Sequence, residues 1–203
     1  MSDKQKQAAI DTDFFVKLTK KNADGKLFLD VMREFKATPV MHTYVYNYEL
    51  AGNTAARLLV EKKLIRVVDY EEYLPKDRSH YANAFYNAYQ SFNFKKLDHS
   101  RDIYTYQHQG ESLGEIRTAL MALYMNINVF MSDDREARTY VKNRISSSRH
   151  RIMAYGIYDT LMYIGKSNDR QLRWSEVKGL AKEILAGKQY DEINKMWHNM
   201  NCE

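Results

Sequence analysis

The chain has 203 residues, of which 44% are hydrophobic and 28% charged, values ordinary for one globular domain with elaborations. No run approaches the roughly 20 apolar residues of a membrane span, and the polar start lacks the apolar stretch of a signal peptide. The only cysteine, Cys202, excludes an intramolecular disulfide and a cysteine-based zinc site. We therefore expect a cytoplasmic protein.

Apolar strand-like runs alternate with helical patterns along the chain. In chain order the patterns predict strand 7–11, helices 12–18 and 27–35, a very short strand at 40–41, helices 43–50 and 54–62, strand 64–68, helices 79–92 and 113–125, strand 127–131, helix 134–145, strand 151–155, and helices 158–165, 174–186 and 190–199. Such alternation predicts a three-layer α/β/α fold with a mostly parallel sheet.

The predicted elements divide the chain into three parts. Residues 1–6 form a polar tail, residues 7–165 form the α/β domain with a helical insert at about 70–110, and residues 166–203 form a C-terminal helical extension. In the insert, an aromatic face at 81–92 is typical of a packing surface, although the same face can stack nucleobases.

Acidic residues far apart in the sequence are predicted to meet at one edge of the sheet. Asp11 and the pair Asp133/Asp134 follow predicted strands, whereas Glu49 and Glu115 lie on or at the start of helical patterns. Ligands bind outside the carboxyl ends of parallel strands. Carboxylates gathered there repel one another, and a hard divalent cation makes such a cluster tolerable.

Each acid also has a local explanation. Ser112 and Glu115 have the spacing of a capping box, so Glu115 alone is consistent with a helix cap. Asp11 and Asp133/Asp134 precede helical patterns, where acids are favoured. Glu49 by itself is consistent with an exposed surface charge. The four acidic positions follow the order of the predicted strands and helices. Their combination therefore favours a shared metal site over four independent local roles.

Several motifs resemble those of the PIN-domain nucleases, metal-dependent ribonucleases that include toxins of bacterial toxin–antitoxin pairs. The segment Ala-Ile-Asp11-Thr-Asp-Phe-Phe resembles the opening strand of the family, and the segment from Pro39 to Leu50 resembles its proline-led helix ending in Glu-Leu. Gly114-Glu115, followed by an alanine-containing helix, a strand and Asp133-Asp-Arg-Glu-Ala-Arg138, resembles one branch of the family. The segment 151–161 is similar to the closing strand and its glycine turn, and the resemblance covers roughly residues 7–185.

The resemblance implies an Mg²⁺- or Mn²⁺-dependent endoribonuclease whose products carry 5′-phosphate and 3′-hydroxyl ends. It assigns catalysis to Asp11, Glu49, Glu115, Asp133 and Asp134, and metal ligation to all of these except Asp133. Thr12 and Ser132 are expected to orient carboxylates or water, and Arg138 to have a structural role. The chain departs from the family in its 70–110 insert and in having Glu at the third acidic position.

The positive charge is concentrated after the Ser-Asp-Asp motif. Residues 135–203 carry 13 basic and 8 acidic side chains, out of a net charge of +5 for the chain. Within this part, Lys142, Arg144 and Arg149 are candidates for contacts with an RNA backbone, and a solvated helix end is the alternative.

Two functions other than a nuclease are considered for this sequence. The main alternative is a noncatalytic PIN-like module that binds RNA or protein. A phosphoacceptor receiver domain would need a lysine on the last strand, and none stands at 151–155. RNA is the expected partner, whereas an antitoxin protein and a homodimer are left open.

Overall fold

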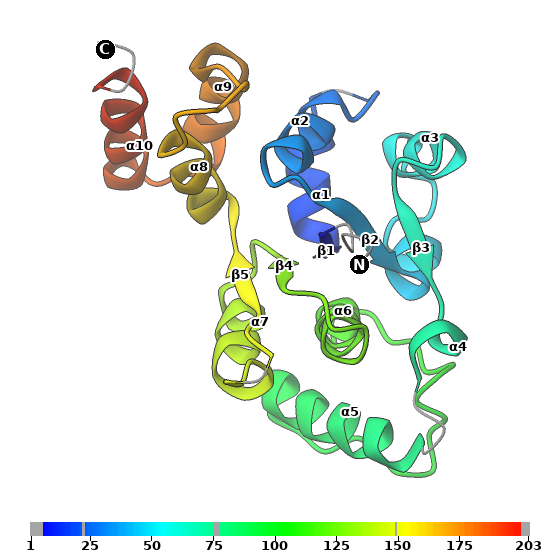
Figure 1. Cartoon of the computed structure of the whole chain (residues 1–203). Helices are drawn as coiled ribbons and strands as arrows, with labels where there is room; N and C mark the ends of the chain where they lie inside the picture. Colours follow the sequence, from blue (N-terminus) through cyan, green and yellow to red (C-terminus); the bar gives the residue numbers. More distant parts are fainter. Residues whose placement is uncertain (1–5, 22, 75–77, 149, 200–203) are drawn as a thin grey trace, which may run out of the picture.

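The computed structural model describes residues 6–21, 23–74, 78–148 and 150–199. Within these ranges one sheet has the strand order β3-β2-β1-β4-β5, and every neighbouring pair is parallel (Figure 1). The strands are β1 (Gln7–Ile10), β2 (Thr38–His42), β3 (Arg66–Val68), β4 (Val129–Met131) and β5 (Met153–Tyr155). The predicted parallel sheet is confirmed.

Helices cover both faces of the sheet, because successive side chains of a strand point to opposite faces. In β1, Ala8 and Ile10 belong to one apolar core and Ala9 to the other. The first core is built with α1 (Thr12–Thr19), α2 (Lys26–Glu34), α3 (Thr54–Glu61), α8 (Ile157–Gly165), α9 (Trp174–Ile184) and α10 (Gly187–Asn199). The second is built with α4 (Tyr70–Tyr73), α5 (Arg78–Asn93), α6 (Leu113–Tyr124) and α7 (Arg135–Tyr140). The fold is therefore three-layered, as predicted.

Two predicted α-helices contain π-helical turns. The predicted helix at 43–50 contains the π-helix η1 (Val45–Glu49), and the predicted helix at 134–145 divides into α7 and the π-helix η2 (Val141–Ile145). Single π-helical turns are frequent at functional sites. The last residue of η1 is Glu49, one of the predicted site acids.

Strand β2 is longer than its sequence indicated. Only residues 40–41 read as a strand, but β2 runs over five residues because it pairs with β1 on one side and β3 on the other. Its last residue, His42, is fully buried: its Nε2 lies 2.9 Å from the Tyr73 hydroxyl, and its Nδ1 accepts the Tyr44 N–H. Burial lowers the pKa of His42 to about 3, so it is a neutral structural residue.

The aromatic face of α5 is a packing surface. Tyr81, Phe85, Tyr89 and Phe92 are all buried, and Tyr81 stacks on Tyr104 farther along the insert. Stacking of these four rings on nucleobases is thereby excluded.

The C-terminal helices share the core of the α/β domain. Trp174, Val177 and Trp197 belong to the apolar cluster that contains Phe14 and Phe28. The Trp197 indole N–H also donates to the Leu161 carbonyl at 3.1 Å. Across the described ranges, the structure contains no helix with the length and apolar character needed to cross a membrane.

Candidate functional site

Asp11 occupies the carboxyl end of the central strand β1. Its backbone N–H donates to the Met131 carbonyl of β4, which fixes the residue where the two strands end. The side chain is 1% exposed, and neither carboxylate oxygen has a hydrogen-bond partner among the described residues. Burial and the nearby charges of Glu115, Asp13 and Glu49 hold the pKa of Asp11 well above its usual range, against a smaller opposing effect of the Ser132 hydroxyl, which lies outside ordinary hydrogen-bond geometry. A buried carboxylate without a partner is costly unless it is protonated or binds a cation.

Glu49 reaches the same place from η1. The Thr12 hydroxyl donates to its Oε2, as the predicted orienting role of Thr12 requires, and the Gly114 backbone N–H at the start of α6 also donates to the carboxylate. A Cβ atom on Gly114 would overlap this carboxylate, so only glycine permits the approach. Burial raises the pKa of Glu49, against the opposing effect of the two donors.

Glu115 lies in the first turn of α6, beside Gly114. Burial, together with the charges of Glu49, Asp134 and Asp13, raises its pKa from 4.5 to about 7. Ser112, the residue that would complete a capping box, has a left-handed backbone (φ 45°), and its side chain makes no capping hydrogen bond to a described residue. The capping-box interpretation is therefore wrong for this helix.

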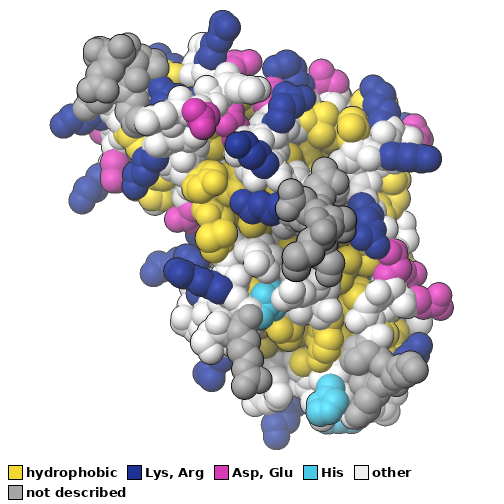
Figure 2. Space-filling model, viewed as in Figure 1, with side chains coloured by type: hydrophobic (Ala, Val, Ile, Leu, Met, Phe, Trp, Pro, Cys, Tyr) yellow, Lys and Arg dark blue, Asp and Glu magenta, His cyan; other side chains and the backbone are white. Residues whose placement is uncertain are grey.

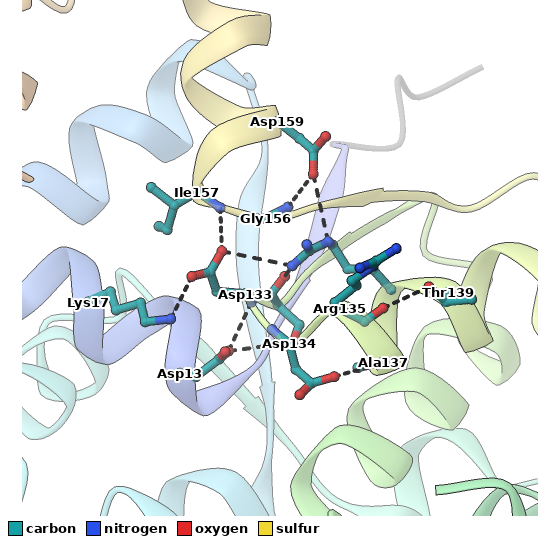
Figure 3. Close-up of polar contacts among 12 residues, drawn as sticks. Asp13, Lys17, Asp133, Asp134, Arg135, Ala137, Thr139, Gly156, Ile157 and Asp159 are labelled. Carbon is teal, nitrogen blue, oxygen red and sulfur yellow. Dashed lines mark hydrogen bonds and ion pairs between the residues drawn. The ribbon is translucent and has the colours of Figure 1, made fainter. Parts of the chain in front are cut away.

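Asp133 and Asp134 are adjacent in sequence but have different surroundings (Figure 3). Asp133 is neutralised: Lys17 Nζ lies 2.5 Å from its Oδ2, and the Ile157 N–H donates to its Oδ1 at 2.9 Å. Asp134 caps α7, accepting the Ala137 N–H at 2.7 Å, and its charge contributes to the raised pKa of Glu115. The charge of Asp134 therefore acts on Glu115, whereas the carboxylate of Asp133 joins neighbouring segments and raises the pKa of Asp13.

Asp13 also belongs to this site, although the sequence analysis did not single it out. Its Oδ1 accepts the Asp133 N–H at 3.0 Å and lies 3.4 Å from the Ser132 hydroxyl. Burial raises its pKa, and its charge raises those of Asp11 and Glu115. The available signal was its position two residues after Asp11, on the first turn of a predicted helix.

Two hydrogen bonds hold the Ser-Asp-Asp turn in place. Arg138 donates from Nη1 to the Ser132 carbonyl at 2.8 Å, which is the structural role expected of it. Ser132 is fully buried, and its hydroxyl accepts the Asp134 N–H at 3.1 Å. A Cβ on Gly156 would meet both Arg138 and Asp133, so a glycine at the end of β5 allows the turn to pack closely.

Arg117 is a second participant that the sequence did not reveal. It is fully buried on α6, two residues after Glu115, and its guanidinium lies 3.9 Å from the centre of the Tyr44 ring. It donates to the carbonyls of Ile103 and Tyr106 in the insert. Its positive charge opposes the rise in the pKa of Glu49. Arg117 thus joins the insert to the helix that carries Glu115 and to Tyr44, the residue before η1.

The carboxylate oxygens are the type of ligand that a hard divalent cation prefers, but they do not form a complete coordination site in this structure. Among the residues whose placement is described, no three His, Cys, Asp or Glu side chains form a group that would hold a metal ion as they stand. The unpartnered, buried carboxylate of Asp11 and the raised pKa of Glu115 nevertheless identify carboxylates that a cation would stabilise. Binding would therefore have to draw the donors together.

The candidate basic cluster is exposed but only partly described. Lys142 and Arg144 lie exposed on η2, whereas Arg149 falls outside the described residues. On the face shown in Figure 2, Lys and Arg side chains are scattered, with acidic side chains among them. This face shows no single basic patch among the described residues, so charge alone does not locate a nucleic-acid surface on it.

Comparison with known proteins finds no matching family model, curated protein or solved structure.

Proposed function

We propose that this protein is an endoribonuclease that hydrolyses RNA phosphodiester bonds with Mg²⁺ or Mn²⁺. The observation that carries the proposal is Asp11, a buried and unpartnered carboxylate at the end of the central strand, whose pKa is raised by burial and three neighbouring acids. Oxygen-only donors suit Mg²⁺ and Mn²⁺, which commonly bridge carboxylates and substrate phosphates.

Asp11, Glu49, Glu115 and Asp134 are the residues that would hold the ion. When bound, the ion would lower the pKa of a bound water that attacks phosphorus. Its positive charge would also stabilise the leaving oxygen. Thr12 orients the Glu49 carboxylate through its hydroxyl. Glu115, with a pKa of about 7, is partly protonated at neutral pH without metal and must release that proton to become a ligand.

Asp133 is given a positioning role in this proposal. The resemblance assigns Asp133 to the catalytic acids, but its carboxylate is occupied by Lys17 and the Ile157 N–H. Those contacts join α1, the Ser-Asp-Asp turn and the start of α8 (Figure 3). Asp133 thereby fixes the position of the backbone at the neighbouring Asp134.

The proposal is tested by measuring cleavage of single-stranded RNA by the purified protein. Cleavage is expected with Mg²⁺ or Mn²⁺, with 5′-phosphate and 3′-hydroxyl ends on the products, and it should stop when EDTA removes the ion. Undiminished cleavage in EDTA would eliminate the metal mechanism. RNA binding without cleavage under every divalent ion tried would favour the noncatalytic binding module.

A further inference from the structure

A groove adjoins the acidic site at the start of α7. Residues of α5, α6, α7 and η2 line the groove, and Figure 1 shows α5, α6 and α7 beside one another. The groove has a volume of about 1210 Å³. It is separate from the acidic site, because none of the proposed metal-binding acids lines it.

The groove combines cationic, amide and apolar side chains. Arg135 and Arg144 line one wall, where Glu136 is the acidic residue among the described lining residues. Asn87 and Gln90 are exposed on the α5 wall, and Leu120 and Leu123 contribute apolar surface. Single-stranded nucleic acid presents phosphates, base edges and flat ring faces, which match these three kinds of side chain.

Phe94 is an exposed aromatic ring at the rim of this groove. It is 85% exposed, the most exposed of the large hydrophobic side chains in the described chain, and lies just past the end of α5. Its backbone has a φ of 52°, a conformation that a bulky residue rarely adopts. This exposed ring is accessible for stacking, unlike the buried rings of α5.

The groove begins next to the acidic site, at the first turn of α7. Asp134 caps that helix, and Arg135, its first residue, lines the groove. The six residues of α7 span about 9 Å at the rise of an α-helix, and η2 continues this wall to Ile145. A strand with nucleotides about 3.4 Å apart must therefore exceed roughly three nucleotides to follow the whole wall. A strand leaving the acidic site beside Asp134 would enter the groove at Arg135.

We propose that the groove binds the single-stranded RNA segment that flanks the cleaved bond. A base stacks on Phe94, Arg135 and Arg144 bind phosphates, and the amides of Asn87 and Gln90 contact base edges. The inference rests on the proposed function for its substrate, but it concerns affinity and length preference rather than chemistry.

The test uses fluorescent single-stranded RNAs of 3 and about 15 nucleotides and the cleavage-deficient background Asp11→Asn. In that background Phe94→Ala is expected to weaken binding of the long RNA about tenfold, the scale of one lost stacking contact, and to leave the short RNA nearly unchanged. Arg144→Gln should reduce the salt slope for the long RNA by about 0.7. The matched controls Leu64→Ala and Arg57→Gln remove exposed side chains elsewhere and should change neither quantity.

The outcomes separate this inference from the proposed function. Suppose that the wild-type protein cuts RNA with metal, and that Phe94→Ala and Arg144→Gln leave the affinity for the long RNA unchanged. This result overturns the proposed RNA-binding groove and supports the proposed nuclease activity. Length-dependent binding lost in Phe94→Ala, in a protein that cuts no RNA, supports the groove and overturns the nuclease. Sedimentation showing that Phe94→Ala dissociates a dimer without altering RNA affinity identifies an interface between copies and also overturns the inference.

Discussion

Two buried carboxylates in this protein have opposite surroundings. Asp11 is 1% exposed and Glu111 is 5% exposed, and each lies just before a helix. Around Asp11 the neighbouring charges are acids, whereas Glu111 accepts hydrogen bonds from Lys95 and from the Tyr106 hydroxyl at 2.7 Å.

The pKa values of the two groups follow from these surroundings. Burial and three nearby acids both raise the pKa of Asp11. Burial alone would raise the pKa of Glu111 as well, but the hydrogen bonds from Lys95, Tyr89 and Tyr106 outweigh it and bring the pKa to about 2. Burial of an acid is therefore no sign of function by itself. The missing partner is what distinguishes Asp11 as a candidate ligand from Glu111 as a structural residue.

The largest expected effect is on cleavage. Asp11→Asn should lower the rate of RNA cleavage at least about 100-fold, the scale of losing one key electrostatic group, whereas Glu111→Gln should leave the rate within a few-fold. The measurement is single-turnover cleavage in saturating Mn²⁺. Equal losses in the two variants would remove the distinction between the two carboxylates.

The same pair of variants should change stability in opposite directions. Without metal, Asp11→Asn relieves repulsion among acids and should raise the Tm. Glu111→Gln weakens the hydrogen bonds from Lys95 and two tyrosines, and should lower the free energy of unfolding by roughly 1–3 kcal/mol. Thermal unfolding in EDTA at pH 8 measures both. A lower Tm for Asp11→Asn would show that its carboxylate is stabilised in the metal-free protein.

The raised pKa of Glu115 predicts how stability depends on pH. Because its pKa rises from 4.5 to about 7 on folding, the folded protein resists ionisation more than the unfolded chain does. Metal-free stability should therefore fall as the pH rises from about 4.5 to 7, by about 1.4 kcal/mol per unit of pKa difference. Glu115→Gln should flatten this dependence in urea unfolding series at several pH values, and a series as steep as that of the wild type would contradict the assignment.

Metal should reverse that trend, because ligation needs ionised carboxylates. The rise in Tm on adding Mn²⁺ is expected to be larger at pH 8 than at pH 5, as protons compete with the ion at Asp11 and Glu115. Glu111→Gln serves as the control and should keep the wild-type response. An increase in Tm that is equal at both pH values would place the ion elsewhere.

The smallest expected effect concerns the basic cluster. Neutralising Lys142, Arg144 and Arg149 together should weaken binding to long RNAs of every sequence about equally, and each lost phosphate contact should reduce the salt slope by about 0.7. Cleavage at saturating RNA should change little, since no proposed metal-binding acid is altered. An unchanged slope would assign the cluster to solvent or to a protein partner.

Much of this architecture was determined by local sequence patterns. Alternating apolar runs and helical periodicities located all five strands and most helices, because burial on a sheet face or a helix stripe imposes those periods. The exceptions are instructive. Pairing on both sides lengthened β2 beyond its two apolar residues, and α4, a single turn of four residues, is too short to produce a period.

The acids at strand ends were likewise predictable, since the carboxyl ends of parallel strands share one edge. Which of them keep partners was decided only by the tertiary structure. Lys17 neutralises Asp133 from 116 positions away, and Gly114 makes room for Glu49 across 65 positions of sequence. Asp11 is left without a partner by the same packing. A sequence specifies the end of each strand locally, but the charge and hydrogen bonds around a buried carboxylate come from elements that meet only when the chain folds.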